Sequence, residues 1–166
     1  MRRTDLVIGP ASPDLAESLG TLGFAAWEKS AFGQDDAGRA DRQKLLVEFV
    51  SFCHDKPQTM LIAAADQEIL GWGAREEMDN IVSDLWVAPI AQGQGVGAAL
   101  LDALEGAIAK QGFEFSELET YAGNAGAVRF YERRGYEPIW RGMKFSASLN
   151  YELDKVRFRK SLREAV

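Results

Sequence analysis

A glycine-rich stretch in the middle of the sequence, Gln92–Gly97 (QGQGVG), places the tightest limits on what this chain can fold into. Glycines weaken the start of a helix, yet the most strongly patterned helix of the chain follows at once. Before the stretch, Asn80–Val87 is rich in Ile, Val and Trp and stops ahead of Pro89, which predicts a strand. A strand that turns through glycines into a helix is an arrangement with which proteins hold phosphate groups.

The helix after the loop is predicted over Val96–Lys110, with Gly112 closing it. The residues expected on its buried side are Val96, Ala99, Leu100, Ala103, Leu104, Ala107 and Ile108. A helix N-terminus carries unpaired backbone N–H groups and about half a unit of positive charge, so it attracts phosphate. The glycines before it allow the backbone to approach a ligand because no Cβ intervenes.

Taken alone, the loop has two other interpretations. It is either a plain turn ahead of a helix or a dinucleotide fingerprint, since Gly93-x-Gly95-x-x-Ala98 satisfies that short pattern. The fingerprint belongs in the first strand–helix–strand unit, with an acidic residue closing the next strand. Here the next predicted strand ends in Thr120-Tyr121. A P-loop is excluded because the sequence has no Gly-Lys-Ser or Gly-Lys-Thr.

The rest of the sequence alternates between helical and strand patterns. One amphipathic helix is expected after Ser12, and a second ends near Lys56-Pro57, with a loop around Gly33–Gly38 between them. A later helix is predicted over Asn124–Arg134, with Gly135 as its cap. Strands are expected at Thr4–Ile8, Thr59–Ala65, Ile69–Arg75, Asn80–Val87, Phe115–Tyr121, Tyr136–Phe145 and Tyr151–Lys160. The order βααβββαβαββ predicts an α/β (α+β) fold whose mixed sheet has about seven strands, antiparallel at first and parallel around the crossover helix.

Size, composition and charge narrow the class of protein. A chain of 166 residues suits one domain, expected over residues 1–166. The net charge of −6 argues against nucleic acid as a partner, and no run of about 18 apolar residues predicts a membrane span. The lone Cys53 and the lack of a secretory signal in MRRTDLVIGP make a cytoplasmic location the expectation. Acidic residues dominate up to Val128 and basic ones from Arg129, which fits a cationic substrate and an anionic cofactor or an unevenly decorated surface.

Cys53 and His54 are the residues that most invite a metal or nucleophile hypothesis. They are neighbours on a predicted helix, so their side chains do not face each other. No second cysteine or histidine completes a site. Both are therefore expected on the helix surface, and no metal is expected.

Two stretches, in this order, resemble the two signatures of the GNAT superfamily of N-acetyltransferases. The first, IVSDLWVAPIAQGQGVGAALLDALE, resembles an apolar-x-Val-x-Pro strand end followed by Gln/Arg-x-x-Gly-x-Gly/Ala and a helix. The second, LETYAGNAGAVRFYERRGYE, resembles a strand, an Asn, an Ala three residues later, then a Tyr and a Gly–aromatic pair. The matching positions are Leu85, Trp86, Val87, Pro89, Gln92, Gly95, Gly97, Asn124, Ala127, Tyr131, Gly135 and Tyr136. The order of elements agrees along the whole chain, although roughly the first 55 residues match only in pattern.

The resemblance implies the GNAT fold and acetyl-CoA as co-substrate, bound between the splayed strands Asn80–Val87 and Phe115–Tyr121. The backbone of Leu85, Trp86 and Val87 is then expected to pair with the pantetheine arm like an added strand. Asn124 and Ala127 are expected beside that arm. The residues expected to hold the pyrophosphate are Gln92, Gly93, Gln94, Gly95, Val96, Gly97 and Ala98.

The resemblance also implies direct transfer of acetyl to a primary amine of a small molecule or peptide in a ternary complex. Tyr131 matches the tyrosine that protonates the leaving thiolate, which is sensible because a phenol has a pKa of about 10 and a thiol about 8.5. The resemblance does not identify the residue that acts as general base. Many family members carry a glutamate early in the first strand, where this chain has Ile81. Glu119 and Asp84 are the carboxylate candidates, and a water relay or an amine that arrives neutral needs neither.

The acceptor itself is not readable from the sequence. Aromatic and acidic residues gather in the front segment, where family members build the acceptor pocket, and the acids favour a cationic acceptor. These residues are Phe24, Trp27, Glu28, Phe32, Asp35 and Asp36. A homodimer is a further expectation from the resemblance. The competing hypothesis is a regulatory module that binds acyl-CoA without turnover, which the missing glutamate favours and the retained Tyr131 opposes.

Overall fold

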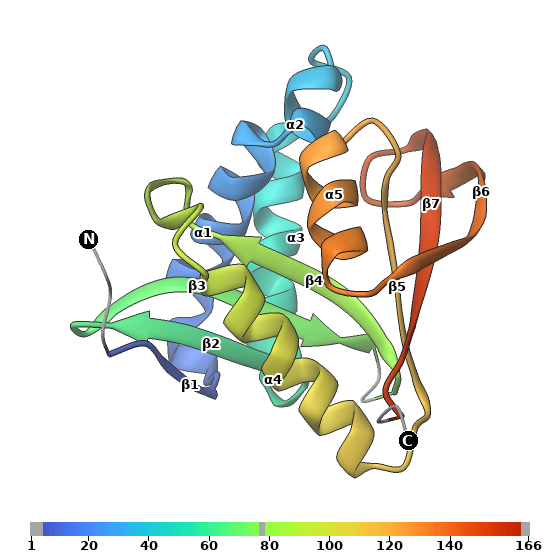
Figure 1. Cartoon of the computed structure of the whole chain (residues 1–166). Helices are drawn as coiled ribbons and strands as arrows, with labels where there is room; N and C mark the ends of the chain where they lie inside the picture. The colour runs from blue at the N-terminus through green and yellow to red at the C-terminus, as the bar shows by residue number, and fades with distance from the viewer. Residues whose placement is uncertain (1–4, 77–78, 164–166) are drawn as a thin grey trace.

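Within residues 5–76 and 79–163, the part of the chain that this computed structural model describes, seven strands form one sheet in the order β1-β2-β3-β4-β5-β7-β6 (Figure 1). The strands are β1 (Val7–Pro10), β2 (Met60–Ala65), β3 (Glu68–Arg75), β4 (Ile81–Val87), β5 (Phe115–Tyr121), β6 (Glu137–Ser146) and β7 (Tyr151–Ser161). All neighbours pair antiparallel except β4 and β5, which are parallel. The predicted mixed sheet is therefore confirmed, with its parallel pair at the crossover.

The helices cover both faces of the sheet. They are α1 (Ala16–Lys29), α2 (Ala31–Asp35), α3 (Arg42–Asp55), α4 (Val96–Lys110) and α5 (Ala125–Arg133). In Figure 1, α1 and α3 lie behind the sheet, while α4 crosses in front of β2–β4 and α5 lies in front of the β5–β7 side. This arrangement places the N-terminal ends of α4 and α5 at the same end of the sheet, near the C-terminal end of β4.

Close contact between α1 and α3 depends on a small residue. A Cβ added at Gly20 would stand 2.6 Å from the Cα of Val50, so only glycine permits this approach. The buried indole of Trp72 on β3 then donates a hydrogen bond to the Leu19 carbonyl of α1 at 2.8 Å. The helical layer is thus attached to the sheet by a polar contact as well as by apolar packing.

On the other side, α5 packs on the C-terminal strands. Tyr136 and Phe158 are almost fully buried there, and Val128 and Tyr131 of α5 pack against them. The buried Tyr136 and Ser116 hydroxyls share a hydrogen bond of 2.8 Å, which satisfies both groups. The basic residues of β7 lie beside acids of β5, since Arg157 and Arg159 both bind Glu117, at 3.1 and 2.9 Å. Part of the basic tail therefore neutralises acids of the front part of the chain.

Several boundaries differ from the sequence prediction. The first strand begins at Val7, and the predicted start at Thr4 lies outside the described residues. Residues Ala31–Asp35 form a short helix where a loop was predicted, because the Ser30 hydroxyl caps it by accepting from the Gly33 amide at 3.1 Å. Gly135 lies one residue past the cap of α5, with φ of 92°.

The prediction of a surface position for Cys53 was wrong. Its side chain is fully buried in the cluster that α1, α3 and β3 share, whereas His54 is largely exposed. Burial raises the pKa of the Cys53 thiol to about 12, and the nearby charge of Asp84 adds to this effect. The thiol therefore behaves as a small core residue rather than as a nucleophile.

Candidate active site

The sheet opens where β4 and β5 part. Their parallel pairing is confined to Ile81↔Glu117 and Val82↔Leu118, whereas β4 stays paired with β3 as far as Val87. The β3–β4 register also shifts here, because Ala74 pairs with Asp84 and Arg75 with Val82. Ser83 is therefore an extra residue on β4, and within the described residues the strand edge beyond it has no strand partner on the β5 side. Such an edge can pair with an extended ligand.

The glycine loop lies at the end of this open edge. Gly93 and Gly95 have φ of 75° and 84°, a conformation in which other residues are strained. Gly95 is the N-cap of α4 and has no side chain with which to cap the first turn. A Cβ at either glycine would meet nothing within 4 Å, so the space in front of the loop is open. The amides at the start of α4 are thus available to an anion.

A cavity of about 660 Å³ joins the loop to the strand edge and to α5. Of the residues predicted to bind the cofactor, the cavity is lined by Leu85, Trp86, Val87, Gln92, Gly93, Gly95, Val96, Gly97, Ala98, Asn124, Ala127 and Tyr131. Gln94 does not line it, and its side-chain amide donates to the Ile90 carbonyl at 3.2 Å. The Gln92 amide similarly donates to the Val87 carbonyl at 3.2 Å. These two side chains brace the loop, so the backbone is left to contact the ligand.

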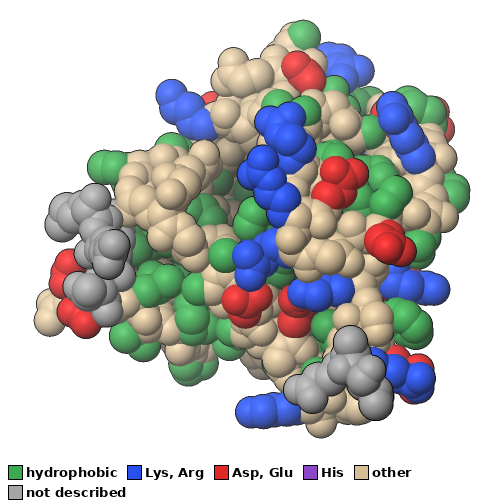
Figure 2. All heavy atoms as spheres, viewed as in Figure 1, with side chains coloured by type: hydrophobic (Ala, Val, Ile, Leu, Met, Phe, Trp, Pro, Cys, Tyr) green, Lys and Arg blue, Asp and Glu red, His purple; other side chains and the backbone are tan. Residues whose placement is uncertain are grey.

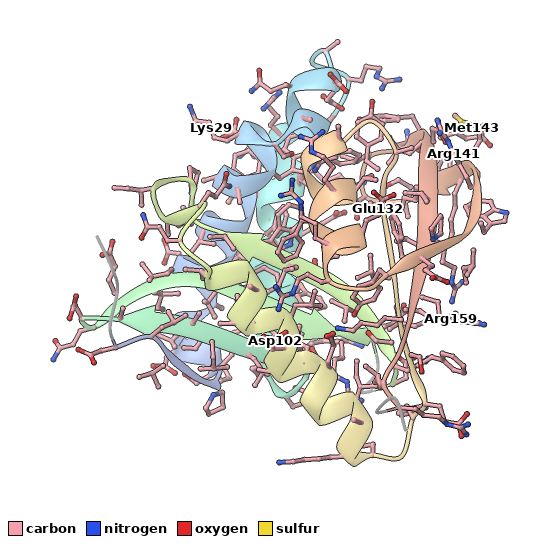
Figure 3. The ribbon with its side chains drawn as sticks, viewed as in Figure 1. Lys29, Asp102, Glu132, Arg141, Met143 and Arg159 are labelled. Atoms are coloured by element: carbon pink, nitrogen blue, oxygen red, sulfur yellow. The ribbon has the colours of Figure 1, made fainter. Side chains whose placement is uncertain are left out.

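The other wall of this cavity was not predictable from any local pattern in the sequence. It is formed by Lys29, Ser30 and Ala31, where α1 passes into α2. Among the described residues that line the cavity, Lys29 carries the one positive charge, and Figure 3 shows it at the end of α1 on the side of the loop before α4. Figure 2 shows the surface hollowed here, with basic side chains along the side where α5 lies. The site therefore has a positive rim suited to an anionic ligand.

A second cavity, of about 220 Å³, adjoins the first and penetrates between β4 and β5. The two cavities share Ser30, Leu85, Trp86, Asn124, Ala127 and Tyr131. Asn124 stands at their junction as the N-cap of α5, where its side-chain oxygen accepts from the Ala127 amide at 3.2 Å. The second cavity is also lined by both candidate bases, Asp84 and Glu119. We name it the transfer cavity.

Tyr131 reaches the transfer cavity from α5. Its ring packs against Phe130, Tyr136 and Phe158, with centroids 5.2, 5.8 and 6.2 Å away. No group of the described residues hydrogen-bonds its hydroxyl. Burial raises the pKa of this phenol well above its ordinary value, and the charge of Asp84 raises it further. Tyr131 is therefore a protonated hydroxyl, held by its ring, with its hydrogen bond free for a ligand.

Asp84 reaches the same cavity from β4. One carboxylate oxygen accepts from the Trp86 indole at 3.1 Å, and the other accepts from the Ser83 hydroxyl at 2.9 Å. Burial raises the pKa of Asp84, and the charge of Glu76 acts in the same direction, while the two hydrogen bonds partly oppose them. A carboxylate with a raised pKa is a stronger base than an ordinary aspartate.

Glu119 faces a different environment. Its carboxylate accepts from the Lys144 ammonium at 2.9 and 3.0 Å, and Lys155 and Arg157 each stand 3.9 Å away. Its oxygens are thus already held by cations, which makes it less available to a substrate proton than Asp84 is.

The acids of the front segment bind the protein's own side chains. Glu28 pairs with Arg42 at 2.8 Å, and Asp35 accepts from the Tyr121 hydroxyl at 2.9 Å. Asp36 is buried and accepts from the Tyr151 hydroxyl and the Ala40 amide. Among the aromatic residues of this segment, Trp27 and Phe32 line a third cavity, next to the transfer cavity, whereas Phe24 stacks on Trp27 at 6.2 Å.

Comparison with known proteins decides the family. A model of the acetyltransferase (GNAT) family matches residues 23–136, more than half of the chain. The chain belongs to the GNAT family of acetyltransferases. Its co-substrate is accordingly acetyl-CoA, and the protein is an acyltransferase. The residues of the loop and the open strand edge fit that group, since they offer unpaired amides to a pyrophosphate and a strand edge to the pantetheine arm.

Solved structures of GNAT proteins share the fold. A GCN5-related N-acetyltransferase from Rhodopseudomonas palustris has a TM-score of 0.80 and 21% identity, with 98% of this chain and 99% of that chain covered. The putative acetyltransferase yncA from Salmonella typhimurium, solved with acetyl-CoA, has a TM-score of 0.68 and 16% identity over 98% and 97% of the two chains. The paia N-acetyltransferase from Thermoplasma acidophilum, in complex with coenzyme A, has a TM-score of 0.64 and 18% identity over 95% and 99%. A search of curated proteins finds no significant match.

Two further observations concern membrane-spanning helices and metal sites. In the described part of the chain, no helix is long and apolar enough to cross a membrane. Among the same residues, no group of three or more His, Cys, Asp or Glu could hold a metal ion.

Proposed function

We propose that this GNAT protein transfers acetyl from acetyl-CoA directly to a primary amine within a ternary complex, with Tyr131 as general acid. The observation that carries the proposal is that the unpartnered Tyr131 hydroxyl and the Asp84 carboxylate line one cavity, which opens onto the space before the glycine loop. A proton donor and a proton acceptor on one small cavity are what an amine and a thioester need when they react there.

Each protein group has a defined part in the step. Asp84 first takes one proton from the bound ammonium and passes it to solvent, which leaves the amine neutral. The amine nitrogen then attacks the thioester carbonyl carbon, a C–N bond forms, and Asp84 takes the second proton that the nitrogen loses. The C–S bond then breaks, and the thiolate sulfur takes the proton of the Tyr131 hydroxyl. Solvent returns a proton to Tyr131, and Asp84 releases its proton to solvent. The products are the N-acetylated amine and coenzyme A.

Asp84 is preferred as the base on geometry and environment. It and Tyr131 line the transfer cavity together, and its carboxylate is bound only by two neutral donors among the described residues. Glu119 lines the same cavity but is held by Lys144 and faces two further cations. The absence of a glutamate at Ile81 is thus compatible with a base three residues further along the same strand, at Asp84.

Coenzyme A release with a panel of primary amines tests this function. The panel holds arylalkylamines, polyamines, amino acids, aminoglycosides and short peptides, and product mass identifies the acetylated amine. We expect amine-dependent release together with a product heavier by one acetyl group. Binding of acetyl-CoA without turnover of any amine would instead favour the regulatory module.

A further inference from the structure

The third cavity next to the transfer cavity has the size and the walls of a small-molecule site. Its volume is about 370 Å³, within the range of ligand pockets. Aromatic rings and three leucines form most of its wall, and we name it the aromatic chamber. Its apolar lining residues are Trp27, Phe32, Leu45, Phe49, Phe52, Trp86, Leu149 and Leu153.

The chamber is preformed, because its rings are held in place by one another. Phe49 meets Trp86 edge-on at 5.4 Å, and Trp27 meets Phe32 edge-on at 5.8 Å. The Trp86 indole is fixed further by its hydrogen bond to Asp84 at 3.1 Å. A ligand that enters the chamber therefore replaces solvent on rigid apolar walls and orders few side chains as it does so.

The chamber and the transfer cavity meet at four residues. Phe32, Asp84, Trp86 and Lys155 line both, so the Asp84 carboxylate stands where one space opens into the other. An amine whose body occupies the chamber would therefore place its nitrogen at Asp84. The same nitrogen would then face the transfer cavity, which Tyr131 also lines. The reverse orientation would leave an ammonium among the rings and leave Asp84 unpaired.

The charges along this route favour a cation. Asp84 and Glu48 both line the chamber. Within the described residues the buried Oε2 of Glu48 has no hydrogen-bond partner, while its Oε1 lies 3.7 Å from the Lys44 ammonium outside the chamber lining. The only cation among the described lining residues is Lys155, which stands 3.9 Å from Glu119. The chamber thus has a net negative lining with an apolar interior.

We propose that the acceptor is a small primary amine on an apolar body of about the size of one aromatic ring, with the ring in the aromatic chamber and the nitrogen at Asp84. This inference rests on the proposed acetyl transfer and names its substrate class. The apolar walls favour an aromatic body, since burying an aromatic group contributes far more binding free energy than burying a methyl group does. The carboxylate at the junction selects the amine end.

A pair of primary amines that differ by one phenyl group tests whether the apolar walls select the body of the acceptor. With the full chain and saturating acetyl-CoA, kcat/KM for 2-phenylethylamine should exceed that for ethylamine at least about 30-fold. Spermidine and kanamycin should be poorer than 2-phenylethylamine, because their charged bodies lose hydration in an apolar chamber. A phenylalanine-initiated peptide should also be poorer. A polyamine, an aminoglycoside or that peptide as the best acceptor would overturn the proposal.

A substitution that fills the mouth of the aromatic chamber tests whether the acceptor binds there. Ser148 is exposed and lines the mouth of the chamber, so Ser148→Phe should raise KM for 2-phenylethylamine at least about tenfold and leave KM for acetyl-CoA unchanged. Ala147→Phe is the matched control, since Ala147 is exposed in the same turn but does not line the chamber. Equal effects of the two changes would contradict the placement.

The panel also separates this inference from the function on which it rests. The protein could acetylate several amines without preferring an aryl body, and lose this activity in Tyr131→Phe. That result would overturn the acceptor class alone. No turnover of any amine by a protein that binds acetyl-CoA would overturn both.

Discussion

Asp84 on β4 and Tyr131 on α5 line the same cavity, and the negative charge of Asp84 helps to keep the Tyr131 hydroxyl protonated. The two residues are brought together because β4 and β5 part after Val82 and α5 covers the gap. A base whose charge helps to keep the neighbouring acid protonated is suited to a reaction in which one proton leaves an amine and another reaches a thiolate.

Asp84→Asn should lower kcat/KM for the best amine by about 10²–10⁴-fold, since it removes the proposed base and keeps an oxygen for the Trp86 indole. Glu119→Gln is the comparison, because it lines the same cavity but is held by Lys144. We expect a loss of less than about tenfold for Glu119→Gln, as its role here is to pair with cations. The reverse ranking in steady-state assays would assign the base to Glu119.

Asp84→Asn should also stabilise the fold at neutral pH. The folded-state pKa of Asp84 is raised, so the folded protein prefers the neutral acid and is destabilised as pH rises from the ordinary carboxyl range through the raised pKa. The variant has no charge to bury, and we expect its Tm to rise by about 3 °C above pH 7 and to change little near pH 3. Calorimetry at the two pH values measures this difference, and a lower Tm at both would refute it.

The pH profile of kcat should have an acid limb from Asp84 and no alkaline limb from Tyr131. The base must be ionised, so activity falls as pH drops through the Asp84 pKa, which lies above that of an ordinary aspartate. The groups that face Asp84 are Ser83, Trp86, Cys53, Glu76 and, across the two cavities that it lines, Tyr131, Lys155, Glu119 and Glu48. The Tyr131 pKa is raised, so its proton remains in place to at least about pH 10. An acid limb that persists unchanged in Asp84→Asn would remove Asp84 as its source.

Gly95→Asp should weaken acetyl-CoA binding at least about tenfold more than Gly95→Ala does. Both variants force a side chain into the left-handed conformation at φ of 84°, and the aspartate tolerates it better than the alanine, so backbone strain does not account for a larger loss in Gly95→Asp. Only the aspartate adds a negative charge at the N-cap of α4, in front of the amides proposed for the pyrophosphate. Titration calorimetry with acetyl-CoA compares them, and equal affinities would move the pyrophosphate away from this loop.

Local patterns predicted the elements that carry the cofactor half of the site. The limits of Val96–Lys110 and Phe115–Tyr121 agree with the structure because helical periodicity and a β-rich run each act over a few residues. The two strands on either side of the β2–β3 turn were also predicted, although Asp66 and Gln67 adopt φ of 52° and 64° so that β3 begins already at Glu68. Such features need no knowledge of distant residues.

The parts that were missed depend on contacts between distant segments. Cys53 is buried because α3 faces α1 and the sheet, which one helix pattern does not reveal. Asp84 and Glu119 were equivalent as acids on strands, and what separates them is Lys144 on β6 and Lys155 on β7. Lys29 belongs to the cofactor wall only because α1 ends beside the loop before α4.

The most direct test of acetyl transfer at this site measures Tyr131→Phe twice, by acetyl-CoA affinity and by kcat with the best amine. Tyr121→Phe is the matched control, since Tyr121 also lines the transfer cavity but its hydroxyl is bound to Asp35. We expect an unchanged Kd for acetyl-CoA and a kcat lower by about 10²–10⁴-fold for Tyr131→Phe alone. A kcat within twofold of the parent protein for Tyr131→Phe would contradict this expectation.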